Sequence, residues 1–436
     1  MKRIFILILF IVSNISLNAQ EDKTYQSIEE ALINPDQVFS LELRGEEIIE
    51  IPRTIKKLKN LKYLSIENTQ LTSLPKGIGK LKNLTSLDFR MNHIKSLPKS
   101  FGKLKKLKSI NLTDSKITEF PESFGKLISL ERILITITEF EKLPESIGKL
   151  KNLNYINIST SQLTNLPKSI GDLEKLEKLM LGGNKITVLP ESIGNLTNLK
   201  ILFLIDNQFT TLPTSIGKLT NLEELNISNN HFKDLLESIG KLTKLRVLDV
   251  GGNTLTNLPD YITTFKGLTT LNLGKNQLNV LPKSIGNLIN LYSLNLYSNQ
   301  LETLPESIGN LTRLEELYIT NNKLSSLPES FGNMTNLKML YADKNQLKSL
   351  PDSFVKLENL SSLKLSENQL TTLPESIGEM TRLGSIEVDN NQLTSLPKSI
   401  VNLKDLYRVQ IAENHLKREE MQKLITLLPG CDWSFE

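Results

Sequence analysis

The sequence repeats itself every 23 residues over most of its length. Leu-Pro recurs from Leu74-Pro75 to Leu396-Pro397, and every interval between copies is a multiple of 23. Ile51-Pro52 and Phe120-Pro121 hold the same register, and Leu235-Leu236 replaces the proline once, which makes sixteen copies without an insertion or deletion. A unit this short cannot bury a core alone, so the chain must stack its copies on one another.

The segment before each proline predicts a short strand. It reads LxxLxLxxNxL, and with a degenerate first copy at 38–48 there are seventeen such segments. Alternate residues of a strand face opposite sides, so both leucines of Leu-x-Leu point inward when the strands stack in parallel. The proline fixes its own φ on the side of the coil away from the strand, where Ser-Ile-Gly or Ser-Phe-Gly closes a short turn. We predict an α/β repeat solenoid with a concave parallel sheet of about 17 strands and a convex side of short turns or 3-10 segments.

The full unit, LxxLxLxxNxLxxLPxSIGxLxN, resembles the leucine-rich repeat family. Its LPxSIG ending is similar to the subtype of Ras-pathway scaffold proteins and of plant intracellular Ras-group repeat proteins. The resemblance covers nearly all of the chain beyond the N-terminal segment. It implies an arc, or horseshoe, that binds its ligand along the inner sheet.

Composition argues against catalysis. A single Cys excludes an internal disulfide framework and a Cys-rich zinc or iron–sulfur site. His93, His231 and His415 occupy the same position in their repeats, but six and eight repeats separate them, so their side chains cannot form one site. We find no phosphate-binding loop, nucleophile elbow or HExxH motif, and 52 basic against 48 acidic residues do not indicate nucleic acid binding. We predict a protein that is not an enzyme and uses no metal or cofactor.

The N-terminal residues have the order of a secretory signal. Lys2 and Arg3 precede the apolar run 4–12, and a polar stretch brings Ala19 just before an acidic segment. This apolar run is much shorter than the roughly 20 residues that span a bilayer as a helix. We predict a signal peptide at residues 1–20 and a secreted or periplasmic protein. The alternatives are an uncleaved N-terminal membrane anchor and a cytoplasmic protein.

Both ends of the repeat array are expected to carry caps that cover the terminal leucines. Ser27 followed by Glu30 is typical of a capping box, and the short helix it opens ends at Asn34. Near the other end a helical face precedes an alternating segment around Trp433, which predicts a closing strand with Cys431 in the cap core. The predicted boundaries are 21–37 for the N-terminal helical cap, 38–416 for the repeats and 417–436 for the C-terminal helix–strand cap.

The polar residue after each strand divides the array in two. An Asn amide can bond the backbone groups that the turn leaves unpaired, whereas a hydroxyl offers a single donor. We therefore expect the N-terminal third of the array to be the looser part. The first six copies carry Glu46, Thr69, Asn92, Ser115, Thr138 and Ser161, and the next eleven, from Asn184 to Asn414, all carry Asn.

Period-2 geometry identifies the side chains on the inner face, and two groups there stand out. Exposed aromatic and apolar side chains among Asn, Ser, Thr and Lys are typical of binding hot spots, although aromatic residues also pack well on sheets and isolated apolar residues are common on surfaces. The Phe203 group consists of Met180, Ile201, Phe203 and Ile205. The tyrosine group consists of Asn295, Tyr297, Tyr318, Met339 and Tyr341, with Tyr318 and Tyr341 at equal positions on adjacent strands.

Charge is unevenly distributed along the chain. Residues 56–126 hold sixteen Lys and Arg but five Asp and Glu, whereas the whole chain has a net charge of only +4. The excess lies mainly on the loops that precede the strands. It is consistent with a solvated rim, and alternatively with contact to acidic polymers, lipopolysaccharide or an anionic membrane surface.

We therefore predict an exported, non-enzymatic and monomeric solenoid that recognises a protein ligand through its concave face. A glycan ligand is a less favoured alternative, and we expect no nucleic acid partner. Two other functions stay open at this point: a cytoplasmic signalling scaffold of the Ras-group type, and an adhesion or structural element of the cell envelope.

Overall fold

The computed structural model describes residues 23–435, so the predicted signal segment lies outside the described residues. Contacts divide the chain into two units. The first unit extends to Gln208 and includes Leu212–Asn221, and the second comprises Phe209–Thr211 and everything from Leu222 onward. Within residues 23–435, no helix is long and apolar enough to cross a membrane.

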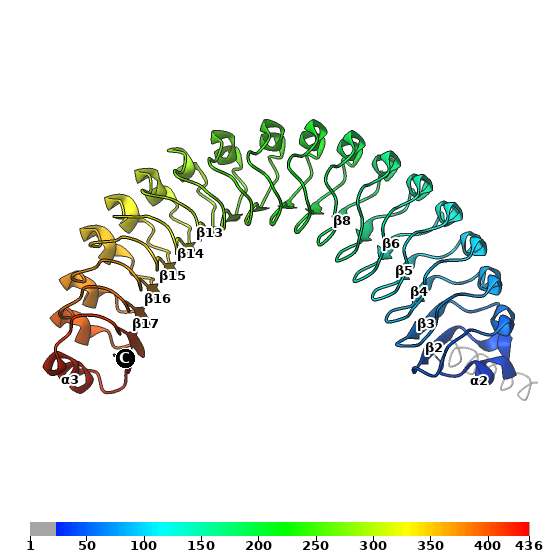
Figure 1. Ribbon diagram of the computed structural model, residues 1–436, viewed down its shortest axis with the longest axis horizontal. Helices are drawn as coiled ribbons and strands as arrows, with labels where there is room; N and C mark the ends of the chain where they lie inside the picture. The colour runs from blue at the N-terminus through cyan, green and yellow to red at the C-terminus, as the bar shows by residue number, and fades with distance from the viewer. Residues whose placement is uncertain (1–22, 436) are drawn as a thin grey trace, which may run out of the picture. The chain divides into compact units, whose positions relative to one another are not determined.

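The first unit is a stack of coils, each with one short strand and one 3-10 turn (Figure 1). Its strands are β1 (Thr24–Tyr25), β2 (Ser40–Arg44), β3 (Tyr63–Glu67), β4 (Ser86–Asp88), β5 (Ser109–Asn111), β6 (Arg132–Leu134), β7 (Tyr155–Asn157), β8 (Lys178–Met180) and β9 (Ile201–Phe203). Its helices are α2 (Ile28–Ile33), η1 (Pro35–Gln37), η2 (Arg53–Lys57), η3 (Lys76–Lys80), η4 (Lys99–Lys103), η5 (Glu122–Lys126), η6 (Glu145–Lys149), η7 (Lys168–Asp172), η8 (Glu191–Asn195) and η9 (Thr214–Lys218).

The second unit is built in the same way and ends in an α-helix and a closing strand. Its strands are β10 (Glu224–Asn226), β11 (Val247–Asp249), β12 (Thr270–Asn272), β13 (Ser293–Asn295), β14 (Glu316–Tyr318), β15 (Met339–Tyr341), β16 (Ser362–Lys364), β17 (Ser385–Glu387), β18 (Arg408–Gln410) and β19 (Asp432–Ser434). Its helices are η10 (Glu237–Lys241), η11 (Asp260–Thr264), η12 (Ile285–Asn287), η13 (Glu306–Asn310), η14 (Glu329–Asn333), η15 (Asp352–Lys356), η16 (Glu375–Glu379), η17 (Lys398–Asn402) and α3 (Arg418–Leu427).

Strand pairing follows the sequence period. Each repeat strand pairs in parallel with the next one in its unit at an offset of one repeat, as Leu179 with Leu202 and Leu317 with Leu340. Within each unit the strands lie on the inner side of the curve and the 3-10 turns on the outer side (Figure 1). The seventeen predicted strands correspond to β2–β18, so the predicted solenoid with a parallel sheet and short outer turns is confirmed.

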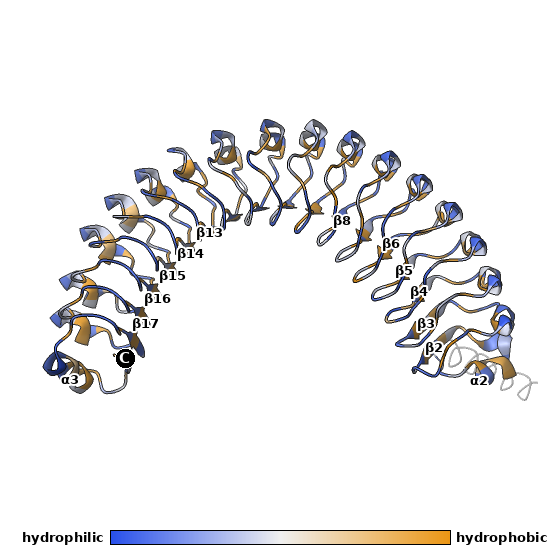
Figure 2. Cartoon of the chain, in the orientation of Figure 1, coloured by the Kyte–Doolittle hydropathy of each residue, from blue (hydrophilic) through white to orange (hydrophobic). Residues whose placement is uncertain are grey.

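Leucine ladders fill the core. The inward residues of each strand and the Ile or Phe of each outer turn are buried, and apolar segments recur in every coil (Figure 2). Proline precedes most of the outer turns in the extended conformation, for example Pro305 with φ −69° and ψ 149°. The residue just before the repeated Asn position has a positive φ, which turns the chain inward, as at Asn321 (58°). Glycine takes this position at Gly183 and Gly252.

The repeated Asn forms the interior hydrogen bonds that the sequence predicts. The Nδ2 of Asn276 donates to the carbonyl oxygens of Val250, Leu273 and Gly274 at 3.1, 3.0 and 3.3 Å. Its Oδ1 accepts the N–H of Leu255, one coil earlier, at 3.1 Å. The same pattern appears at the first and the last Asn of this series, Asn184 and Asn414, so each amide joins consecutive coils.

The hydroxyl slots of the first unit form fewer bonds. The Oγ of Ser115 is buried without a hydrogen-bond partner among the described residues. Thr138 Oγ1 contacts Ser161 Oγ at 2.8 Å and accepts the N–H of Phe140 at 3.3 Å. These copies therefore lack most of the coil-to-coil bonds that Asn supplies.

We expect this difference to appear in hydrogen exchange. Backbone amides of the repeats before residue 184 should exchange faster than those of the repeats after it, because local opening breaks fewer interior hydrogen bonds there. Hydrogen–deuterium exchange resolved by peptide mass spectrometry measures this directly. Lower protection after residue 184 than before it would contradict the prediction.

Both caps contain a helix or strand where the sequence predicts one, with two differences in detail. Ser27 Oγ accepts the N–H of Glu30 at 3.3 Å, as in a capping box. The Glu30 carboxylate does not return to the Ser27 backbone and instead pairs with Lys23 at 2.8 Å. In the second unit, β19 pairs with β18 and Trp433 lies opposite Val409, while Cys431 and Trp433 are only half-buried.

Candidate binding surface

The tyrosine group lies on three adjacent strands of the second unit. Asn295 pairs with Tyr318, and Tyr318 pairs with Tyr341, on β13, β14 and β15. The rings of Tyr318 and Tyr341 meet edge to face, with centroids 5.2 Å apart and an interplanar angle of 86°. Both side chains are half-buried rather than fully exposed, as is Met339 beside them. An edge-to-face pair of this kind is a favourable and rigid aromatic arrangement.

Charged neighbours hold this pair from both sides. Tyr318 Oη donates to Glu316 Oε2 at 3.4 Å, and burial together with the Glu316 charge raises the pKa of Tyr318. The ammonium group of Lys364 lies 4.9 Å from the ring centroid of Tyr341 and pairs with Glu387 at 3.0 Å. The Tyr318 phenol therefore stays neutral around physiological pH.

Asn295 serves mainly to place Tyr297. Its Oδ1 accepts the backbone N–H of Tyr297 at 2.9 Å, and the corresponding residues Asn272 and Asp249 cap the turn in the same way. The Tyr297 side chain is 38% exposed. Asn295 thus fixes the turn from which the Tyr297 ring projects, and it is a positioning residue within the group.

A short strip of buried glycines precedes Tyr297, and sequence reasoning missed it. Gly251 and Gly274 occupy the slot of Tyr297 in the two preceding coils, and a Cβ at Gly274 would lie 3.1 Å from Asn295 Oδ1. Asn272 and Asp249 border this strip, which we call the glycine strip, and burial raises the pKa of Asp249. The signal was present in the sequence, because glycine replaces a side chain at an inner-face position in consecutive repeats.

The Phe203 group lies in the first unit, on β8 and β9. Met180 pairs with Phe203, and all four members are half-buried. Ile205 packs over Gly182, where a Cβ would approach its Cγ2 to 2.7 Å. Two further residues join the group: Tyr155 Oη contacts Met180 Sδ at 3.5 Å, and the Arg132 guanidinium lies 4.7 Å from the Tyr155 ring centroid.

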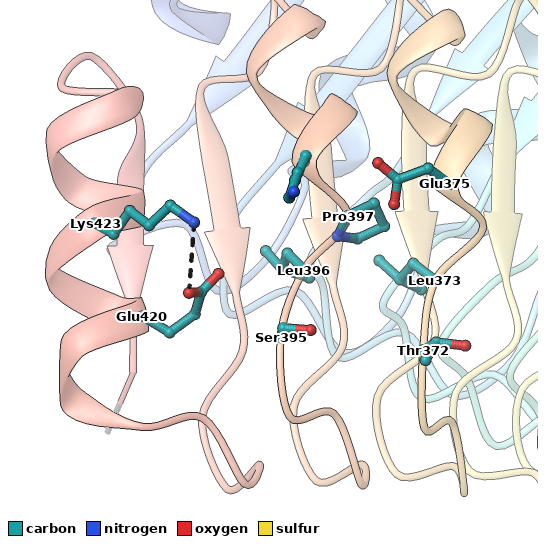
Figure 3. A pocket seen from close by; sticks show the side chains of 9 residues that line it. Thr372, Leu373, Glu375, Ser395, Leu396, Pro397, Glu420 and Lys423 are labelled. Atoms are coloured by element: carbon teal, nitrogen blue, oxygen red, sulfur yellow. Dashed lines mark ion pairs between the residues drawn. The ribbon is translucent and has the colours of Figure 1, made fainter.

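The C-terminal cap borders a pocket away from the inner face. Its volume is about 440 Å³, and it lies between α3 and the last coils of the second unit (Figure 3). Glu375 and Lys398 line it, together with Glu420 and Lys423, which form an ion pair at 3.8 Å. This lining has none of the aromatic character of the tyrosine group.

Residues 23–435 contain no group of three His, Cys, Asp or Glu side chains that could hold a metal ion. Burial, with the nearby charge of Asp432, raises the pKa of the Cys431 thiol to about 11, so the thiolate form is suppressed near neutral pH.

The fold is an open parallel-β solenoid, an architecture whose stacked repeats create extended surfaces for binding. Family models described as a leucine-rich repeat region match residues 38–142, 143–253, 229–323 and 263–369, and a leucine-rich repeat model matches 359–380. The chain therefore belongs to the leucine-rich repeat family. A search of curated protein sequences gave no significant match.

Solved structures similar to this chain include one bacterial and two plant proteins. A leucine-rich repeat protein of Leptospira interrogans is 34% identical over 95% of this chain and 100% of its own, with a TM-score of 0.81. The plant peptide hormone receptor RGFR1, in complex with RGF2, is 28% identical over 94% of this chain and 76% of its own (TM-score 0.69). The leucine-rich repeat ectodomain of the Arabidopsis receptor kinase HAESA, in complex with an extended IDA peptide hormone, is 27% identical over 90% and 69% (TM-score 0.69).

Proposed function

We propose that this protein is a non-enzymatic receptor module that binds an extended segment of a protein ligand across the tyrosine group. The observation that carries the proposal is the edge-to-face pair of Tyr318 and Tyr341 on the same inner face as the glycine strip. Rigid aromatic side chains supply contact area at low entropic cost, and the glycines place no side chain of their own in the slot that precedes Tyr297. Two similar solved structures hold peptide hormones, which supports an extended peptide as the form of the ligand.

The surroundings of the pair suit a peptide backbone. Asn272 and Asn295 offer amide groups beside the glycine strip, and the hydroxyl groups of Tyr318 and Tyr341 extend this polar border. A peptide needs hydrogen-bond partners along its length and pockets for a few side chains. The Phe203 group, in the other unit, is proposed as a second apolar contact surface for the same class of ligand.

We propose further that the protein is exported and acts as a monomer, with residues 1–20 as its signal peptide, 21–37 as N-terminal cap, 38–416 as repeats and 417–436 as C-terminal cap. The Lys2-Arg3 start and the apolar run that follows support export. N-terminal sequencing of the natural protein tests this. An intact Met1 would favour the cytoplasmic scaffold of the Ras-group subtype instead.

The binding proposal is tested by the double variant Tyr318→Ala/Tyr341→Ala. We expect proteins retained by the immobilised chain from culture medium or periplasm to lose affinity by roughly tenfold to hundredfold, because tyrosines that become buried in an interface often act as hot spots. Each retained protein is identified by mass spectrometry, and its Kd for both chains is measured by biolayer interferometry.

The matched control removes two tyrosines elsewhere, in Tyr63→Ala/Tyr407→Ala. Tyr63 is half-buried on β3, and Tyr407 is 63% exposed just before β18. This variant should keep the affinity of the unmodified chain. Equal losses in both double variants, or no loss in either, would place the ligand elsewhere on the molecule.

A further inference from the structure

Nine lysines form two parallel rows at one edge of the first unit. The first row consists of the last residues of the five consecutive 3-10 turns η2–η6, and the second row lies two residues further along the chain. All nine side chains are exposed. We call this set the lysine ladder: Lys57, Lys80, Lys103, Lys126 and Lys149 in the first row, and Lys59, Lys82, Lys105 and Lys151 in the second.

Backbone carbonyls hold second-row ammonium groups against the neighbouring turn. Lys82 Nζ donates to the carbonyl oxygen of Lys103 at 3.1 Å, and Lys105 Nζ donates to that of Lys126 at 2.6 Å. These bonds place positive charges of the two rows close together. Burial and the charges of Lys103, Lys80 and Lys105 lower the pKa of Lys82, which indicates positive charge without local compensation.

The ladder lacks acidic partners, although the same coils supply them elsewhere. Among residues 23–435, Lys151 is the one ladder residue with an ion pair, to Glu174 at 3.6 Å. Away from the ladder, Lys108 and Lys116 each pair with a glutamate of the next coil, at 3.0 and 3.2 Å. Pairing between coils is therefore easy in this repeat, yet eight of the nine ladder lysines form no ion pair among the described residues.

The run of consecutive coils with ladder lysines ends at Lys151, although single lysines return to the first-row position further along, for example at Lys218 and Lys241. In the next two coils, Asp172 and Asn195 take the first-row position, and Glu174 and Thr197 take the second-row position. Lysines needed only for solubility would not have to occupy the same two slots in consecutive coils. At the N-terminal end of the ladder, a depression of about 470 Å³ is lined by Lys56, Lys57, Lys59, Lys80, Lys82 and Asn83.

We propose that the lysine ladder is a second binding site, which takes a linear anionic polysaccharide bearing sulfate, phosphate or carboxylate groups. Consecutive outer turns lie further apart than the strands, which are about 4.8 Å apart: the stacked rings of Phe101 and Phe124, in η4 and η5, have centroids 6.4 Å apart. Because this spacing repeats from coil to coil, a chain with regularly spaced anionic groups can meet successive turns. Lysine supplies point charges that suit such groups without demanding one geometry. The depression would hold one anionic group at the end of the ladder.

The composition of the ladder disfavours two other polyanions. Neither row contains an aromatic residue, which stacks on nucleic acid bases and anchors proteins at membrane interfaces. Arginine, which recognises phosphates with two parallel hydrogen bonds, is absent from both rows as well. The single apolar residue is Ile128, 56% exposed, in the second row between Lys105 and Lys151.

The test measures the Kd of the full chain for dextran sulfate, with neutral dextran, duplex DNA and phosphatidylglycerol-containing vesicles in parallel. We expect tightest binding to dextran sulfate, with an affinity that falls as salt rises, because binding releases counterions. The variant Lys80→Glu/Lys103→Glu/Lys126→Glu should lose at least about tenfold in affinity at low salt and show a shallower salt dependence. Circular dichroism confirms that the variant is folded.

The matched control is Lys185→Glu/Lys233→Glu/Lys348→Glu, which changes the net charge equally at exposed lysines outside the ladder. It should bind dextran sulfate within about twofold of the unmodified chain. Equal losses in both variants would show an effect of net charge alone and overturn the proposal. No binding of dextran sulfate, or tighter binding to vesicles or DNA, would overturn it equally.

Discussion

Asn276→Ala should lower the free energy of unfolding by about 2–4 kcal/mol. The substitution removes three hydrogen bonds from Nδ2 and leaves the N–H of Leu255 without its partner Oδ1. The carbonyls of Val250 and Leu273 keep bonds from Asn253 and Asn299, so the unpaired N–H and the small cavity account for most of the cost. Urea denaturation followed by far-UV circular dichroism measures the change.

The same slot in the first unit provides the matched comparison. Thr138→Ala should cost only about 1 kcal/mol, because Thr138 Oγ1 bonds only Ser161 Oγ and the N–H of Phe140. Ser115→Asn should raise stability by a similar amount, since the register places Ile94 N–H and the carbonyl of Leu112 where an Asn finds its partners. A cost for Asn276→Ala no larger than for Thr138→Ala would contradict the role of the amide.

Strand positions were predictable from the sequence because the period never slips. Each strand from β2 to β18 contains the second leucine-type residue of its LxxLxLxxN segment. The side chains on the inner face then follow from the alternation of residues along a strand. The C-terminal cap was predictable for the same reason, as the alternation around Trp433 places it opposite Val409. The capping box was predictable only in part, because the Glu30 side chain is exposed and free to pair with Lys23.

The arrangement of the candidate surface was less accessible to sequence reasoning. Register alone places Tyr318 beside Tyr341, but it does not fix the perpendicular rings, which depend on the surrounding Glu316 and Lys364 side chains. The carbonyl contacts of Lys82 and Lys105 likewise depend on how long side chains lie across a neighbouring turn. Side-chain direction on an exposed surface is set by such neighbours rather than by the repeat.

The glycine of the outer Ser-Ile-Gly turn has a physical role that its recurrence alone does not reveal. A Cβ at Gly309 would lie 2.1 Å from the carbonyl oxygen of Ser330 in the next coil, and Gly332 is in the same situation against Ser353. Where Thr263 and Val355 replace this glycine, the outer turn packs less closely on the following one, whereas η2, with Lys56 in this place, still packs closely on η3. The glycine therefore allows the carbonyl group of the next coil to approach the outer turn closely.

Gly309→Ala should consequently destabilise the protein by about 2–3 kcal/mol, because the added methyl group meets backbone that can move only if the coils separate. The loss should appear as a lower urea midpoint and as faster amide exchange in η13 and η14, while amides of the first unit stay protected, since repeats interact mainly with their neighbours.

Gly267→Ala is the control, because a Cβ there makes one ordinary contact, 3.5 Å from the carbonyl oxygen of Leu245. We expect it to be neutral or stabilising by less than about 1 kcal/mol, since it only restricts the unfolded chain. If Gly309→Ala proved as mild as Gly267→Ala, the outer turns would have to separate at negligible cost. The looser packing beside Thr263 and Val355 would then be a local adjustment, without consequence for the stability of the stack.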